Sequence, residues 1–125
     1  MPYLLVGLGS MTGGCARYSV ARFVGTSGTS GHLPLATLLI NVSGSFVLGL
    51  LAGIIALKSP AHAAALHLAL GVGFCGGFTT FSAFAVENVL LLDNGRWPTA
   101  LAYTAMSVIL GLLAVRLGLV TARMF

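Results

Sequence analysis

Charged side chains are scarce in this 125-residue sequence. Only 6% of its residues are Asp, Glu, Lys or Arg, and its mean hydropathy is +1.04. A typical soluble domain carries roughly a quarter charged residues. Six basic and two acidic side chains could not cover the surface of a water-soluble fold of this size. The composition therefore excludes a soluble globule and predicts that lipid surrounds most of the chain.

The sequence also has few residues that could crosslink the fold or catalyse a reaction. Cys15 and Cys75 lie in apolar segments, so we expect free thiols that pack as small hydrophobes. The histidines fall in or near predicted loops, where we expect them to be solvated or interfacial: His32, His62 and His67. No nucleophile–base pair, metal-ligand cluster or phosphate-binding loop is visible in the sequence, which argues against an enzyme. The basic excess is too scattered for a nucleic-acid binder.

Helix-breaking residues divide the chain into four apolar segments. A membrane core of roughly 30 Å takes about 20 helical residues at 1.5 Å each. The polar stretches 25–31, 58–60 and 93–95 separate segments of about this length. We therefore predict one all-α domain over residues 1–125, with four transmembrane helices at about 3–24, 34–57, 62–92 and 98–120. Because it has no basic leader pattern, segment 3–24 is expected to be a span and not a signal peptide.

The third segment contains an unusual run of small and hydroxyl residues at mid-membrane. Each glycine inside a helix costs about 1 kcal/mol relative to alanine. The run predicts that the segment breaks into two half-helices. Its members are Gly71, Gly73, Gly76, Gly77, Thr79, Thr80 and Ser82. Backbone groups freed by such a break need partners in protein or in a polar cavity, and broken membrane helices commonly hold ions. Close helix packing through small residues is the alternative interpretation.

The basic residues divide equally between the two expected faces of the membrane. One face has Lys58, Arg116 and Arg123, and the other has Arg17, Arg22 and Arg96. Loops rich in Lys and Arg normally stay in the cytoplasm, so a tie gives no preferred orientation. We expect the chain to insert both ways and to form an antiparallel, dual-topology homodimer. A small four-helix chain has too little polar interior to enclose a pore by itself, which favours a path at the dimer interface.

Asn41 and two phenylalanines are the candidate site residues that the pattern itself provides. Asn41 lies at the centre of an uncharged span, where a buried amide needs partners. An interhelical hydrogen bond and a transport role would each satisfy it. Phe81 and Phe84 lie three residues apart and share a helical face, with Ser82 beside them. Such rings usually face lipid or core, but their positive edges can also stabilise a small anion without a formal charge.

Three motifs are similar to those of one protein family. They are Gly9-x-x-x-Gly13-x-x-x-Arg17-Tyr18, Thr37-Leu38-x-x-Asn41-x-x-Gly44-Ser45-Phe46, and Gly73-Phe74-Cys75-Gly76-Gly77-Phe78-Thr79-Thr80-Phe81-Ser82-x-Phe84. On these motifs the sequence resembles the Fluc (CrcB) fluoride channel family. The match covers essentially the whole chain, with comparable length and spacing.

The resemblance implies a fold, an activity and a set of site residues. Members of the family form antiparallel dual-topology homodimers with two fluoride pores and a central sodium ion. By resemblance, the chain is a fluoride-selective channel of the bacterial inner membrane, which exports fluoride passively and lowers its cytoplasmic concentration. The resemblance assigns these residues to the pore: Asn41, Phe81, Phe84, Ser82, Tyr103 and Ser107. It places Arg17 near a pore vestibule and assigns the backbone carbonyls of Gly76 and Thr79 to Na+.

The sequence departs from the family pattern at Ala83, where the family commonly has threonine. Gly111, one helical turn beyond Ser107, offers no replacement hydroxyl. Two other functions stay open. A small multidrug-type cation exporter has a similar length but needs a carboxylate deep in its first helix, and residues 1–16 carry no charged side chain. A non-transporting membrane assembly subunit would dock another protein through its glycine-rich faces.

Overall fold

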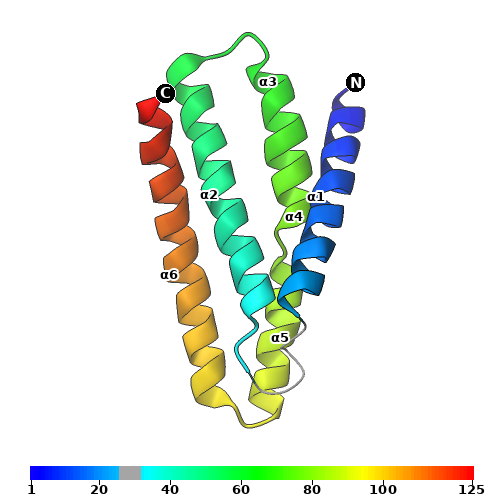
Figure 1. The fold of residues 1–125 in the computed structure, drawn as a ribbon, viewed down its shortest axis with the longest axis vertical. Coiled ribbons are helices and arrows are strands. Elements are labelled where there is room, and N and C mark those ends of the chain that lie inside the picture. Colours follow the sequence, from blue (N-terminus) through cyan, green and yellow to red (C-terminus); the bar gives the residue numbers. More distant parts are fainter. Residues whose placement is uncertain (26–31) are drawn as a thin grey trace.

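The computed structural model describes residues 1–25 and 32–125, so the loop predicted at 25–31 lies, apart from its first residue, outside the described residues. Every regular element of the described part is helical, and the long helices run side by side (Figure 1). In chain order the elements are α1 (Pro2–Val24), α2 (Leu35–Lys58), α3 (Ala63–Leu66), the π-helix η2 (His67–Cys75), α4 (Gly76–Phe78), α5 (Phe81–Asp93), α6 (Trp97–Thr121) and the 3-10 turn η3 (Ala122–Met124). The all-α prediction is confirmed for these residues.

Three of the predicted membrane segments have the length and apolar character that a span requires. Within the described residues they are Leu35–Lys58, Ala63–Asp93 and Trp97–Met124, with mean hydropathies of 2.2, 1.5 and 2.0 in their most apolar stretches. α1 has 23 residues, about 34 Å of helix at 1.5 Å per residue. It is not in this set, because glycines, hydroxyl residues and two arginines dilute its apolar side chains. Its role as a fourth span stays a prediction.

Most large apolar side chains face outward. Leu101, Leu112 and Leu117 of α6, for example, are 66%, 67% and 59% exposed. The buried core is small by comparison and centres on Leu38, Leu91, Ala100 and Tyr103. In water such an exterior would aggregate, whereas lipid or a second apolar chain suits it.

α2 and α6 make the most extensive helix–helix contact and run in the same direction (Figure 1). Gly49 lies against the backbone of Val115, and Gly53 lies against Leu119. Small residues let two helix backbones approach closely in a membrane. Because both pairs are the same number of residues apart in the sequence, the two helices keep a constant register along this contact.

α1 packs against the first half of the third segment through glycines on both sides. A Cβ added to Gly73 would lie 2.9 Å from the Cα of Gly9, and one added to Gly77 would lie 2.5 Å from the Ser10 carbonyl oxygen. The close-packing interpretation is therefore confirmed for Gly73 and Gly77. η2, which contains Gly71 and Gly73, is wound as a π-helix, a form that the sequence analysis did not predict.

Candidate functional site

The third segment breaks at Thr79 and Thr80. Their backbones are extended, with φ −76° and ψ 160° at Thr79 and φ −151° and ψ 118° at Thr80, between α4 and α5. This confirms the predicted break. The glycines before it remain helical, so the hydroxyl residues form the break itself.

Asn41 of α2 bridges the break from the neighbouring helix. Its Oδ1 accepts a hydrogen bond from the Thr80 amide at 2.8 Å, and its Nδ2 donates to the Thr80 carbonyl at 3.0 Å. One side chain thus satisfies both backbone polar groups of a residue at the break. Backbone N–H and C=O groups within the hydrocarbon core need such partners inside the protein. Nδ2 carries a second hydrogen, which this pair of contacts does not use. Asn41 therefore makes the interhelical hydrogen bonds that the sequence analysis offered as one of two roles.

Carbonyls before the break, those of Gly76 and Thr79 among them, lose the amide partners that a continuous helix would supply. In such a helix the Thr80 amide would donate to the Gly76 carbonyl, and the Ala83 amide to the Thr79 carbonyl. Here the Thr80 amide donates to Asn41, and the Ala83 amide donates to Thr80 Oγ1 at 3.2 Å. The Gly76 and Thr79 carbonyls are the two that the sequence analysis assigned to a cation.

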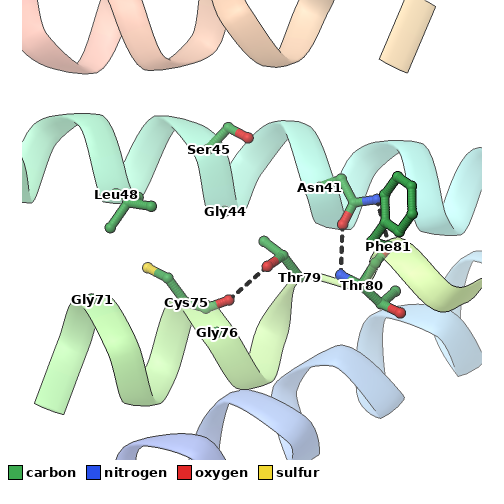
Figure 2. Close-up of a pocket in the computed structure, with 10 residues that line it drawn as sticks. All are labelled: Asn41, Gly44, Ser45, Leu48, Gly71, Cys75, Gly76, Thr79, Thr80 and Phe81. Atoms are coloured by element: carbon green, nitrogen blue, oxygen red, sulfur yellow. Dashed lines mark hydrogen bonds between the residues drawn. The ribbon is translucent and has the colours of Figure 1, made fainter. Parts of the chain in front are cut away.

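A partly open cavity of about 320 Å³ lies beside the break (Figure 2). It brings Asn41 and Phe81, predicted to line a pore, together with Gly76 and Thr79. The thiol residue Cys75, which is free and buried, also lines it. The remaining lining residues are Gly44, Ser45, Leu48, Gly71 and Thr80. Amide, hydroxyl and carbonyl groups therefore gather in the cavity beside the break.

Phe81 and Phe84 stand together at the start of α5. Their ring centroids are 5.6 Å apart with the planes tilted by 41°, and the Phe84 centroid lies 5.2 Å from that of Tyr103 in α6. Phe81 is 79% exposed, whereas Phe84 is half-buried. The exposed ring leaves its edge free for a ligand or for a second chain.

Glu87 of α5 is a polar site residue that the sequence analysis did not assign. The Tyr103 hydroxyl donates to its Oε2 and the Thr37 hydroxyl donates to its Oε1, both at 2.7 Å. Tyr103 is fully buried and Thr37 is 6% exposed. A carboxylate inside a membrane segment is costly unless it is paired in this way. The available signal was the lone acid within a predicted span, but its partners come from two other helices.

The other predicted residues differ in their surroundings. Ser82 Oγ is exposed and lies 3.3 Å from Thr80 Oγ1. Ser107 Oγ on α6 is the one buried side-chain polar atom of the described residues that has no hydrogen-bond partner. Arg17 is half-buried on α1 and is not among the residues that line the cavity. The predicted polar residues therefore come from α2, the start of α5 and α6, whereas Arg17 comes from α1.

Comparison with known proteins gives consistent matches over nearly the whole chain. Residues 4–119 match the family described as CrcB-like protein, Camphor Resistance (CrcB). A Moorella thermoacetica protein named fluoride-specific ion channel FluC 2 is 42% identical over 122 residues, which are 98% of this chain and 97% of that protein. Proteins named fluoride-specific ion channel FluC from Paracoccus denitrificans and Caulobacter sp. are 43% and 40% identical. They match 97% and 96% of this chain over 94% and 93% of their own lengths.

Proposed function

The chain belongs to the CrcB family, and from this premise we infer that it is a fluoride-specific ion channel and not an enzyme. The observation that carries the inference is that relatives about 40% identical over nearly the whole chain bear that name. The protein lets fluoride leave the cell passively across the inner membrane and so lowers cytoplasmic fluoride. Its helical spans suit that membrane, because outer-membrane-type spanning proteins are barrels.

We place the fluoride path along the aromatic and polar residues around the break. The proposed lining residues are Asn41, Phe81, Phe84, Ser82, Tyr103 and Ser107, with Arg17 near a vestibule. Removing water from a small anion is costly, so an uncompensated apolar pore would exclude fluoride. A fixed cation at the constriction would hold it too firmly, because conduction needs sites that are favourable but weak. Ring edges, an amide N–H and hydroxyls are donors of this intermediate strength.

We propose that a sodium ion binds at the break, held by the Gly76 and Thr79 carbonyls and by the same groups of a second copy. The fit rests on two features of the site: these carbonyls lose their helical amide partners, and both residues line one cavity. Backbone oxygens suit a hard cation, and neutral oxygens compensate a monovalent charge better than a divalent one. When bound, the ion would supply positive charge that ties the two copies together.

Replacement of sodium tests this site in the intact protein. With a large organic cation in place of sodium, we expect a lower melting temperature of the dimer in detergent and reduced fluoride flux in liposomes. Potassium and lithium at equal ionic strength separate an ion-specific effect from general screening. Unchanged melting and unchanged flux in the organic cation would contradict the sodium site.

We further propose that two copies assemble antiparallel, with α1 as the fourth span of each copy. The open side of the cavity and the exposed Phe81 ring support a second chain as the neighbour. Such a partner would bring a second set of carbonyls and rings to the cavity, which one chain leaves partly open.

Fluoride efflux from liposomes that contain only the purified protein tests the proposed function. We expect rapid efflux of fluoride and little efflux of chloride, each followed with an ion-selective electrode. Absence of fluoride efflux from folded protein would overturn the proposal. Proton-driven cation transport would then indicate a multidrug-type exporter, and absence of both activities would indicate an assembly subunit.

A further inference from the structure

The parallel contact between α2 and α6 has a constant register, which places polar residues of the two helices at matching levels. Gly49 lies against Val115 and Gly53 against Leu119. Thr37 and Tyr103, joined by Glu87, are the same number of residues apart as these glycine pairs. Successive levels are four residues apart on each helix, which is about 6 Å along the axis.

Ser45 and Gly111 form the level one turn before that of Gly49 and Val115. A Cβ added to Gly111 would meet one atom within 4 Å, the Oγ of Ser45, at an ordinary contact distance of 3.8 Å. In Figure 2 the Ser45 side chain leaves α2 toward the pale orange helix, which is α6. The α2 hydroxyl therefore lies within contact distance of the position that a side chain at Gly111 would take.

The direction of the Ser45 hydroxyl distinguishes it from its neighbour Ser43. Ser43 Oγ donates to the carbonyls of its own helix, at 2.7 Å to Leu39 and 3.2 Å to Ile40. Ser45 instead lines the cavity beside the break, one helical turn from Asn41. One turn before Gly111 on α6, Ser107 Oγ is buried and has no hydrogen-bond partner among the described residues. The contact thus carries hydroxyls at two successive levels, from Ser107 on α6 and then from Ser45 on α2, beyond the Tyr103 hydroxyl that donates to Glu87.

We propose that Ser45 is a further fluoride-contacting residue, whose hydroxyl continues from that of Ser107 on α6 at the level of Gly111. This inference rests on the proposed channel function. A dehydrated anion that leaves the Ser107 hydroxyl needs another donor within about one helical turn, because an apolar step would leave its charge without a partner. Gly111 has no side chain to provide it. Ser45 provides the donor from the opposite helix, and the hydroxyl still has two lone pairs and a rotatable hydrogen for exchange between partners.

Moving the hydroxyl between the two helices tests the proposal. We expect Ser45→Ala to lower fluoride efflux from liposomes about tenfold, a rise of about 1.4 kcal/mol in the barrier. Adding Gly111→Ser to Ser45→Ala should restore most of the flux, because α6 then carries the hydroxyl at the same level. Adding Gly111→Ala instead should not, since it fills the same space without a donor. Ser43→Ala, which removes a hydroxyl bonded within its own helix, is the matched control and should conduct like the wild type.

The outcomes separate this inference from the proposed function. Wild-type protein that carries no fluoride would overturn both. Wild-type conduction with an unaffected Ser45→Ala variant would overturn the role of Ser45 alone. Equal flux in the Gly111→Ser and Gly111→Ala double variants would also overturn it, because Ser45 would then act only in packing. If Ser45→Ala does not fold, the pair Ser45→Thr and Ser45→Val replaces it, matched in volume and different in the hydroxyl. The threonine variant is then expected to conduct about tenfold faster than the valine variant.

Discussion

The proposed mechanism requires the rings of Phe81 and Phe84 to stabilise fluoride through their edges. Their rings lie 5.6 Å apart at the start of α5. Isoleucine keeps bulk and hydrophobicity but removes the ring quadrupole that presents a positive edge to an anion. We expect Phe81→Ile and Phe84→Ile to form folded dimers whose fluoride efflux is reduced at least about tenfold, or about 1.4 kcal/mol of barrier.

Phe23→Ile is the matched control for these variants. Phe23 is 94% exposed near the end of α1 and takes no part in the proposed path. Efflux in this variant should equal that of the wild type. Normal conduction by both the Phe81 and the Phe84 variant would show that the rings serve packing and that the fluoride path lies elsewhere.

Sequence alone singled out candidate polar residues by type but not their partners in the fold. Asn41 stood out because an amide in an uncharged span must be satisfied, yet its partner Thr80 lies 39 positions away and depends on how α2 docks. Glu87 was visible as an acid within a predicted span, but its role was not, because its partners Thr37 and Tyr103 are distant in sequence. Lone polar residues can be found by their cost in lipid, whereas pairing is a property of the assembled helices.

At the scale of the element, the break in the third segment depends on a single donor–acceptor pair from α2. Asn41→Asp replaces the Nδ2 donor by an oxygen, which would face the Thr80 carbonyl and repel it. We expect this variant to lose about 1–3 kcal/mol of stability, the cost of an unsatisfied buried polar group. Its carboxylate would also repel fluoride, so efflux should be abolished.

Asn94→Asp provides a matched comparison outside the membrane. The Asn94 side chain also donates to a carbonyl, that of Leu90 at 2.7 Å, but it is exposed at the end of α5. Water can replace the lost partner there, so melting temperature and efflux should stay near the wild-type values. An Asn41→Asp variant that melts and conducts like the wild type would remove Asn41 from both roles.

The contact of α1 with the third segment makes a second prediction about an element. A Cβ on Gly9 or Gly13 would overlap the carbonyl oxygens of Ala69 and Phe74, respectively. Gly9→Ala and Gly13→Ala should therefore separate the helices and cost about 1–3 kcal/mol, as overpacking does. Thermal unfolding in detergent measures the loss.

Gly14→Ala is the control that the same helix offers, because no atom lies within 4 Å of its added Cβ. Alanine is the better helix former by about 1 kcal/mol, so this variant should be as stable as the wild type or slightly more so. If all three variants melted alike, close glycine packing would not hold α1 in place.

The extents of the elements were predicted more closely than their internal form. Apolar runs bounded by breakers placed the segments at 34–57, 62–92 and 98–120 within about one residue of the helices at Leu35–Lys58, Ala63–Asp93 and Trp97–Thr121. The position of the break was less accessible, because glycines that signal a weak helix also permit close packing. The π-helix gave no signal, since composition does not distinguish its winding from an α-helix.

On the scale of the whole molecule, both termini and the connection between α2 and α3 lie at one end of the bundle, and the connection between α5 and α6 lies at the other (Figure 1). This agrees with the assignment of Lys58 and Arg123 to one face and of Arg22 and Arg96 to the other. The distribution of basic residues is then the main determinant of topology.

The equal distribution of basic residues predicts insertion in both orientations. A single cysteine added after Phe125, in a background with Cys15 and Cys75 replaced, should react with a membrane-impermeant thiol reagent from either side of the membrane. About half of the molecules should be labelled from each side, because three basic residues on each face give no bias. Labelling from one side only would contradict the antiparallel dimer.

Three lysines added to the connection near Lys58 should fix one orientation and abolish fluoride efflux, because every molecule then lacks an inverted partner. Co-expression with a variant that carries lysines near Arg96 should restore efflux, since the two fixed orientations complement each other.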